Sequence, residues 1–568
     1  MTSEKLETLI REALKKMGVT AEEIKLERPE GLAHGDYATN VALTYAKDQK
    51  MAPKQFAEKL VAELLSPPHE GIEKIEIAGP GFINFFLDDA SFTKALEDAL
   101  RGGEKWGTNE LLKNKKIIVE YTDPNPFKQF HIGHLMSNTI GESMACMFES
   151  TGAEVKRACY QGDVGMHVSC AVWGLLEMEK EGAVKDIDSQ TLGKAYARGA
   201  TALKEDENAK KEITEINKKI YTRSDNEINK IYDTGRQISL DYLEENYKKL
   251  GMKPTEGGKS FDFYFFESKT GESGKKLVLE HPEIFEKSEG AIIYRGDESK
   301  GLHTRVFINK EGLPTYEAKE LGLAKIKYDT YPYDVSIVVT ANEIKDYFKV
   351  LLDAMAKVYP ELAEKTEHYS HGMLRLPTGK MSSRTGDVIT AESLLSDIKI
   401  LALEKIKDSD FSEQEKNDIA EKVALGAIKY SILRQSSGKD IIFDFKKSLS
   451  FEGDSGPYLQ YAYARSRSLL EKANGKKIDV SSYKEISPLH KYIVRFPEVV
   501  LHASMARQSH YIATYLIDLA REFNSFYGNT IVLDGSSDES YKLALVKATS
   551  QTLKKGLELL GIPVPERM

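Results

Sequence analysis

The sequence has few cysteines and no long apolar run. Its 568 residues include only 3 Cys, and none of them forms a CxxC pair or lies beside clustered histidines. This pattern excludes a zinc framework and a disulfide scaffold, so we expect reduced, buried thiols and no bound zinc. No run reaches the roughly 18 apolar residues of a membrane span, and the charged amphipathic N-terminus does not fit a signal peptide. We therefore expect a cytoplasmic protein with no membrane partner.

The sequence also has fewer basic than acidic residues. Lys and Arg number 79 against 88 Asp and Glu, which gives a formal net charge of −9. This argues against a protein that coats nucleic acid indiscriminately, because such binding depends on cations that neutralise phosphates. A selective RNA partner remains open, since a large protein can carry a basic track on one face.

The length of the chain predicts several domains. A chain of 568 residues is too long for one hydrophobic core, and the usual domain size suggests about three or four units. Residues 1–105 mix helix patterns with strand-like runs around Pro80 and Gly81, whereas residues 396–568 are almost entirely helical in pattern. We predict an N-terminal α+β domain at 1–105 and a C-terminal all-α helical bundle at 396–568.

Residues 106–395 follow a βα pattern. The apolar run 117–122 is typical of a buried parallel strand, and a Pro/Asn turn leads from it into a helix. A lysine- and glutamate-rich helical insertion follows at about 175–260. Later strand patterns, which should complete the sheet, lie at 261–266, 290–295, 303–309 and 333–340. We predict an α/β fold, with a doubly wound parallel-sheet (Rossmann-type) domain at 106–395.

A histidine pair opens the helix after the first of these strands. In the segment HIGH, His131 and His134 are at i and i+3 and so lie on one face of the first turn. A helix N-terminus attracts anions, and Gly133 leaves room for a flat base or ribose. Because open α/β sheets bind ligands at this edge, we expect a nucleoside triphosphate here. The alternative is a pair of capping or core histidines.

A second charged segment, GKMSSRTG, occupies residues 379–386, about 250 residues later. Lys380 offers a compact positive charge for developing phosphate charge, and the flanking glycines would let a loop swing. Alone, such a segment could be a solvated basic turn.

Together these motifs resemble a known family. HIGH and KMSSR resemble the signature pair of class I aminoacyl-tRNA synthetases, and VEYTDPNPFKQFHIGHL resembles the corresponding stretch of the arginyl enzymes. Further matches, near both ends and in the middle of the chain, are GDYATNVA, GPGFINFFL, GLPTYEAKELGLA and GIPVPERM. The resemblance implies an arginine–tRNA ligase that forms arginyl-adenylate from ATP, with Mg²⁺ carried by ATP, and transfers arginine to the 3′ end of tRNA(Arg). It also implies that activation depends on tRNA, and we expect a monomer.

The resemblance also implies roles for individual residues. The catalytic set it implies is Lys128, His131, His134 and Lys380. The ATP-binding set is His131, Gly133, His134, Lys380, Met381 and Ser382. The arginine-binding set is Glu120, Asn125, Tyr316 and Glu320.

Residue chemistry supports an acidic pocket at Glu120, which ends the apolar strand pattern. A planar guanidinium requires carboxylates or carbonyls, because that cation is costly to bury unpaired. The alternative is a solvated glutamate at a strand end.

The sequence departs from the family pattern at several positions. Glu320 stands where the family usually has Asp, and Glu343 and Ile344 stand where a glutamine is frequent. Ser383 replaces the second lysine of the signature loop, and the resemblance implies that Lys128 supplies that charge. On its own, Lys128 could equally be a surface lysine on a turn.

The tRNA contacts are predicted at both ends of the chain. The N-terminal part resembles the extra domain of arginyl enzymes, where Asn84 between Phe82 and Phe86 could contact a base. The same alternation suits core strand residues. In the C-terminal part, helices resembling the anticodon-binding domain carry Tyr458, Tyr461, Arg465, Arg507 and Tyr511, whose spacing also fits packing.

Three other functions compete with this interpretation. A class I synthetase for another amino acid is disfavoured by Glu120 and by the match at the end of the chain. A nucleotidylyltransferase with an HxGH motif would not need the helical C-terminal bundle. A non-catalytic tRNA-binding paralogue should have lost signature residues, and both signatures are present.

Overall fold

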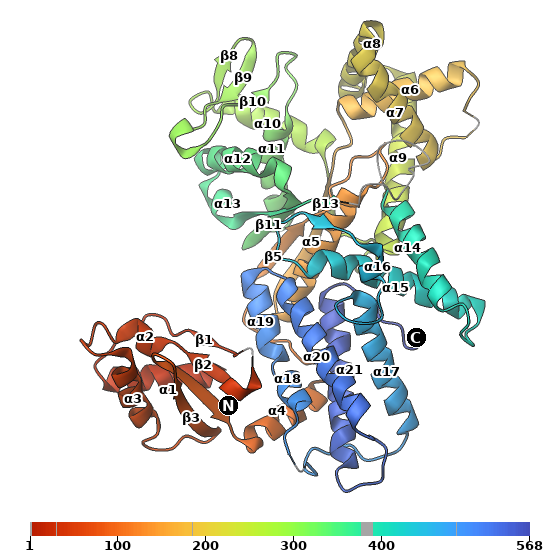
Figure 1. Ribbon diagram of the computed structural model, residues 1–568. Coiled ribbons are helices and arrows are strands. Elements are labelled where there is room, and N and C mark those ends of the chain that lie inside the picture. Colours follow the sequence, from red (N-terminus) through yellow and green to blue (C-terminus); the bar gives the residue numbers. More distant parts are fainter. Residues whose placement is uncertain (1–2, 30, 185, 376–389, 484) are drawn as a thin grey trace. The chain divides into compact units, whose positions relative to one another are not determined.

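The computed structural model describes residues 3–29, 31–184, 186–375, 390–483 and 485–568 (Figure 1). They form two compact units. The first contains residues up to 107 with 462–499 and 518–555, and the second contains 108–461, 500–517 and 556–568. Four helices contribute residues to both units: α17 (Gly456–Lys472), α19 (Phe496–Ala506), α20 (His510–Asn529) and α21 (Glu539–Leu559). Each compact unit thus contains segments that are distant in the sequence. The predicted domain boundaries near residues 105 and 395 stay a prediction.

The first unit contains a four-stranded antiparallel sheet in the order β1-β2-β4-β3. Its elements are α1 (Ser3–Lys16), β1 (Leu26–Glu27), η1 (Leu32–His34), β2 (Tyr37–Thr39), α2 (Val41–Tyr45), α3 (Pro53–Leu64), β3 (Ile72–Ala78), β4 (Phe82–Leu87), α4 (Asp89–Gly102), η2 (Gly103–Lys105) and α18 (Pro488–Ile493). Leu6, Ile10 and Leu14 recur every fourth residue, so α1 buries one apolar face. The predicted N-terminal α+β architecture is confirmed.

The second unit is built on a five-stranded parallel sheet in the order β12-β11-β5-β6-β7. Its elements are β5 (Lys116–Glu120), α5 (Ile132–Ser150), β6 (Glu154–Gln161), β7 (Phe263–Phe266), β11 (Val335–Ala341) and β12 (Thr366–His371). The chain runs from β5 outward through β6 to β7, then returns to the other side of β5 with β11 and β12. This reversal beside β5 is the point where open α/β sheets bind ligands. The predicted Rossmann-type sheet is confirmed.

Two groups of elements project beyond this sheet in Figure 1. The yellow helices are α6 (Met166–Lys180), α7 (Ser189–Glu205), α8 (Glu207–Thr222) and α9 (Asn226–Lys249). The light-green group contains α10 (Glu267–Glu280), β8 (Glu286–Ser288), β9 (Ala291–Tyr294), η3 (Glu298–Lys300) and β10 (Arg305–Ile308). Strands β8 to β10 form their own antiparallel sheet and do not join the parallel one. The prediction that residues 290–295 and 303–309 complete the parallel sheet is therefore wrong. Only two residues connect β8 to β9, and so short a connection permits only an antiparallel pair.

The remaining elements of the described chain are mostly helical. They are α11 (Tyr316–Thr330), η4 (Asn342–Ile344), α12 (Lys345–Val358), α13 (Pro360–Lys365), β13 (Leu374–Arg375), α14 (Ala391–Lys405), α15 (Glu413–Leu433), β14 (Ile441–Ile442) and α16 (Phe445–Ser448). Ser412 and Glu415 form a capping box at the start of α15. The predicted helical C-terminal part is confirmed. None of the helices in the described ranges is long and apolar enough to cross a bilayer.

Candidate active site

The turn between β5 and α5 is held by contacts from three elements. Thr122 and Asp123 have left-handed φ values of 79° and 40°, which residues other than glycine rarely adopt. The Thr122 N–H donates to Ser137 Oγ at 3.0 Å, and that hydroxyl donates to the Val339 carbonyl at 2.9 Å. Asp123 Oδ1 accepts the Tyr160 N–H at 2.8 Å. Strained backbone that its surroundings hold in place is common at functional sites.

His131 and His134 cap α5 with their side chains. His131 Nδ1 accepts the Gly133 N–H at 3.1 Å, and His134 Nδ1 accepts the His131 N–H at 3.3 Å. The rings stack with centroids 3.6 Å apart, and a Cβ on Gly133 would come within 2.9 Å of the His131 ring. Burial lowers the pKa of both imidazoles, assisted by the nearby charge of Lys128. Because Nδ1 accepts in both neutral rings, each retains an Nε2–H for a phosphate oxygen.

Lys128 lies near this histidine pair. Its Nζ is 4.9 Å from the centroid of the Tyr196 ring in α7, and burial lowers the pKa of its ammonium group. The helical insertion therefore contributes an aromatic face beside Lys128. A cation over an aromatic ring is stabilised while it retains its charge.

The KMSSR residues Lys380, Met381 and Ser382 lie outside the described residues. The described chain on either side makes backbone contacts with other segments. Leu374–Arg375 pairs with Ile441–Ile442, and Thr390 forms a bridge with His131. The Ala391 N–H also donates to the Phe130 carbonyl at 2.9 Å. The chain that follows the second signature thus lies directly against the first.

Carboxylates gather at the end of β5, with Glu120 buried and Asp123 and Glu320 half-buried. Glu120 Oε2 accepts from Lys327 Nζ at 2.8 Å, and these side chains are only 1% and 4% exposed. Burial, followed by the charge of Glu120, raises the pKa of both Asp123 and Glu320. Lys327 pairs with Glu120, and its charge also acts on Asp123 and Glu320. A bound guanidinium would supply the positive charge that this cluster lacks.

A second buried ion pair lies beside Asn125. Lys319 Nζ donates to Glu267 Oε2 at 2.6 Å. A Cβ on Gly162 would lie 2.3 Å from Asn125 Oδ1 and 3.3 Å from Glu267 Oε1, so glycine is required for this close approach. Tyr316 is 55% exposed, with its ring centroid 5.2 Å from Lys319 Nζ. Tyr316 therefore lies at the solvent-exposed edge of the Lys319–Glu267 pair.

The sequence reasoning missed three charged residues of this pocket, namely Lys327, Lys319 and Glu267. One signal could have revealed Lys327. Tyr316, Glu320 and Lys327 are four and seven residues apart, which places them on one face of a helix. No local sequence pattern predicts the ion pair between Glu267 and Lys319, because the two residues come together only in the folded chain.

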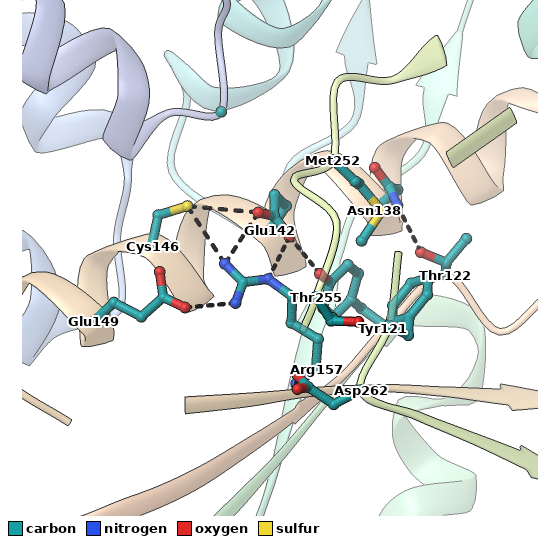
Figure 2. Close-up of polar contacts among 12 residues, drawn as sticks. Tyr121, Thr122, Asn138, Glu142, Cys146, Glu149, Arg157, Met252, Thr255 and Asp262 are labelled. Carbon is teal, nitrogen blue, oxygen red and sulfur yellow. Dashed lines mark hydrogen bonds and ion pairs between the residues drawn. The ribbon is translucent and has the colours of Figure 1, made fainter. Parts of the chain in front are cut away.

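A buried network joins β5, β6 and α5 (Figure 2). Glu142 accepts from the Tyr121 hydroxyl at 2.5 Å and from Arg157 Nε and Nη2 at 2.9 and 3.1 Å. Arg157 also pairs with Glu149 at 2.5 Å. Burial disfavours the Glu142 charge, but Arg157 outweighs this and the pKa of the carboxyl is lowered. The network fixes Tyr121, the residue after Glu120, to the middle of α5.

In the first unit, Asn84 and Arg465 are the predicted tRNA contacts. Asn84 is buried in β4 with 7% exposure. Arg465 Nη1 donates to Asn524 Oδ1 at 2.6 Å, and its guanidinium lies 4.7 Å from the Tyr527 ring centroid. Contact of either side chain with a base stays a prediction.

In the second unit, the other predicted tRNA contacts lie on helices α17, α19 and α20 or beside them. Tyr458 and Tyr461 are half-buried on α17. Arg507 pairs with Glu367 of β12 at 2.7 Å, and Tyr511 is exposed. Of these four, Tyr511 presents the most accessible ring to an approaching base.

Metal-binding clusters were sought over the same described ranges. There, no group of three or more His, Cys, Asp or Glu side chains could hold a metal ion. The cysteines are unpaired thiols, with Cys159 and Cys170 buried and Cys146 half-buried.

Family comparisons cover most of the chain. Residues 95–445 match "tRNA synthetases class I (R), catalytic domain", residues 4–87 match "Arginyl tRNA synthetase N terminal domain", and residues 459–568 match "DALR anticodon binding domain".

Individual relatives agree with these matches. The arginine–tRNA ligase of Clostridium acetobutylicum is 31% identical over 558 residues, which cover 96% of each chain. That of Fusobacterium nucleatum is 31% identical over 548 residues, covering 94% of this chain and 93% of the relative. Arginyl-tRNA synthetase of Thermus thermophilus superposes with a TM-score of 0.81 at 25% identity over 100% of both chains. The Plasmodium falciparum structure shares the fold, with a TM-score of 0.79 at 20% identity over 100% of this chain and 99% of the other.

The domain matches and the full-length relatives indicate the same family as the histidine pair and the carboxylates at the end of β5. The chain belongs to the arginyl-tRNA synthetases, a family of class I aminoacyl-tRNA synthetases.

Proposed function

We propose that the protein acts as an arginine–tRNA ligase whose buried carboxylates bind the substrate guanidinium. One observation carries this proposal. Glu120, Asp123 and Glu320 act on one another at the carboxyl end of β5, and Lys327 is the cation that pairs with Glu120 and acts on the other two. Uncompensated buried carboxylates are costly, and a guanidinium matches them in both charge and geometry.

Each of the arginine-binding residues would contact a different part of the substrate. Lys327 engages Glu120 Oε2, so the guanidinium would bind the other oxygen of Glu120 together with Glu320. Glu320 reaches one methylene further than the aspartate usual in the family. Tyr316 would cover the aliphatic stem of arginine, and Asn125 would orient its amino-acid end.

The ATP side would depend on the two signatures. His131 and His134 would donate Nε2–H bonds to phosphate oxygens, with Gly133 permitting their stack. Lys128 and Lys380 would stabilise the charge that develops on the phosphates, and Met381 and Ser382 would complete the ATP contacts. Catalysis would come from alignment and charge stabilisation, so no side chain need act as a nucleophile.

Two transfers would occur at this site. A carboxylate oxygen of arginine attacks the α-phosphorus of ATP, which enters with Mg²⁺, and the bond to pyrophosphate breaks. The hydroxyl of the terminal ribose of the tRNA then attacks the arginyl carbonyl. AMP leaves, and the hydroxyl proton is released.

The remaining parts of the proposal concern tRNA and organisation. We assign tRNA binding to the domains at 1–105 and 396–568, with contacts at Asn84, Tyr458, Tyr461, Arg465, Arg507 and Tyr511, and catalysis to the domain at 106–395. Arginine activation should require tRNA(Arg), because bound tRNA would favour the state in which Lys128 and Lys380 are correctly placed. We expect a cytoplasmic monomer without zinc.

Pyrophosphate exchange tests this function. We expect ATP–pyrophosphate exchange with arginine alone among the common amino acids, and only when tRNA(Arg) is present. Exchange supported by another amino acid would overturn the assignment of arginine. Full exchange with arginine in RNA-free protein would overturn tRNA dependence and leave the arginine assignment intact.

A further inference from the structure

Tyr347 carries a buried hydroxyl group with no hydrogen-bond partner among the described residues. The residue lies in the first turn of α12, directly after β11 and η4. Its ring packs on Phe348, with centroids 5.3 Å apart, and against the apolar cluster around Leu321 and Val338. Burying a hydroxyl without a hydrogen-bond partner is destabilising, so phenylalanine would serve better at this position if packing were the only role.

Tyr347 packs beside the elements that carry two of the site carboxylates. The cluster it packs against contains Leu321, which follows Glu320, and Val338, which is the register partner of Glu120. Burial raises the pKa of Tyr347, and the next contributions come from the carboxylates of Glu320, Glu317 and Glu267, in that order. The guanidinium carbon of Arg305 lies 6.0 Å from the centroid of the Tyr347 ring. Tyr347 thus has a cation near its ring as well as the carboxylates that raise its pKa.

Two of these carboxylates already have cations. Glu317 lies 4.0 Å from Arg305 Nη1, and Glu267 pairs with Lys319 at 2.6 Å. No ion pair of Glu320 occurs in the described ranges. Glu320, whose charge contributes most after burial to the raised pKa of Tyr347, is therefore the one of the three that forms no ion pair in those ranges.

This region is the side of the pocket where the sequence departs from the family pattern. Glu343 and Ile344, which replace the frequent glutamine, both have exposed side chains. Tyr347 follows three residues later and directs a polar atom inward. It is therefore the candidate on this segment for a direct substrate contact.

We propose that Tyr347 is a specificity-determining residue of the arginine pocket. In the arginine complex its hydroxyl donates a hydrogen bond to Glu320 and accepts one from a guanidinium N–H. A hydroxyl has one donor and two acceptor positions, whereas the guanidinium has donors only, so both partners are satisfied. This inference rests on the proposed binding of the guanidinium beside Glu120 and Glu320.

Tyr347→Phe removes only the hydroxyl. The arginine KM in pyrophosphate exchange with tRNA should rise about tenfold or more, because a hydrogen bond to a charged group is lost. The ATP KM should stay unchanged, and the thermal midpoint without arginine should be unchanged or higher. Tyr359→Phe is the matched control, since Tyr359 packs on the same apolar cluster just after the far end of α12. It should leave the arginine KM unchanged.

A wild-type arginine KM in Tyr347→Phe would overturn the inference, as would an equal rise in Tyr347→Phe and Tyr359→Phe. Glu320→Gln separates this inference from the proposed site. If Glu320→Gln raises the arginine KM and Tyr347→Phe does not, only the role of Tyr347 fails. If neither variant changes it, the proposed guanidinium site fails as well.

Discussion

Glu120 and Lys327 can be separated by mutation into a structural and a substrate-binding contribution. Their side chains are 1% and 4% exposed and are joined at 2.8 Å. Glu120→Gln leaves the Lys327 ammonium buried without its counter-charge. Breaking such a pair from one side typically costs about 3–5 kcal/mol of stability.

The same substitution should weaken arginine binding. Loss of one partner of a desolvated charge pair costs roughly 2–5 kcal/mol, which corresponds to an increase of about 30- to 5,000-fold in the arginine KM. The ATP KM should change little, because the histidine pair makes no contact with Glu120. Pyrophosphate exchange in the presence of tRNA(Arg) measures both constants.

Two further variants separate the effects. Glu120→Gln with Lys327→Met replaces the pair by neutral side chains, so the thermal midpoint should return toward the wild-type value while the arginine KM stays high. Lys327→Met alone leaves another uncompensated carboxylate. Arginine should therefore raise the thermal midpoint of Lys327→Met more than that of the wild type, since binding supplies the missing cation.

The result that refutes this reasoning is an arginine KM in Glu120→Gln equal to that of the wild type, whatever its stability. It would mean that Glu120 serves only as the counter-ion of Lys327.

Two other predictions concern the second signature and a buried histidine. Lys380→Ala should lower kcat for activation about 10²- to 10³-fold with little change in the arginine KM, and unchanged kcat would remove Lys380 from the mechanism. Burial of His490 lowers its pKa from 6.5 to about 4. The unfolded chain therefore takes up a proton that the folded chain does not, and stability falls as the pH drops from 6.5 toward 4, by up to about 3 kcal/mol. His490→Gln should show a smaller loss of thermal midpoint between pH 7.5 and 5, and an equal loss would contradict the assignment.

The sequence predicted the parts of the site that local pattern determines. The apolar run of β5, the Pro/Asn turn and the two histidines are contiguous, and a single βα unit brings them together. Glu120 was found for the same reason, because it ends that strand.

Other features depend on pairing between distant segments. Lys327 and Glu120 are 207 residues apart, and no local pattern links them. Strands β9 and β10 have ordinary strand patterns, so the sequence could not show that they pair with each other and not with the parallel sheet. No local pattern shows that the Tyr347 hydroxyl is buried without a hydrogen-bond partner among the described residues; only the folded structure shows it.

A structure of the protein with arginine and tRNA(Arg) tests the central claim most directly. We predict that the guanidinium lies within about 2.7–2.9 Å of carboxylate oxygens of both Glu120 and Glu320. A guanidinium bound elsewhere, with neither carboxylate in hydrogen-bond contact, would contradict the claim that this acidic pocket selects arginine.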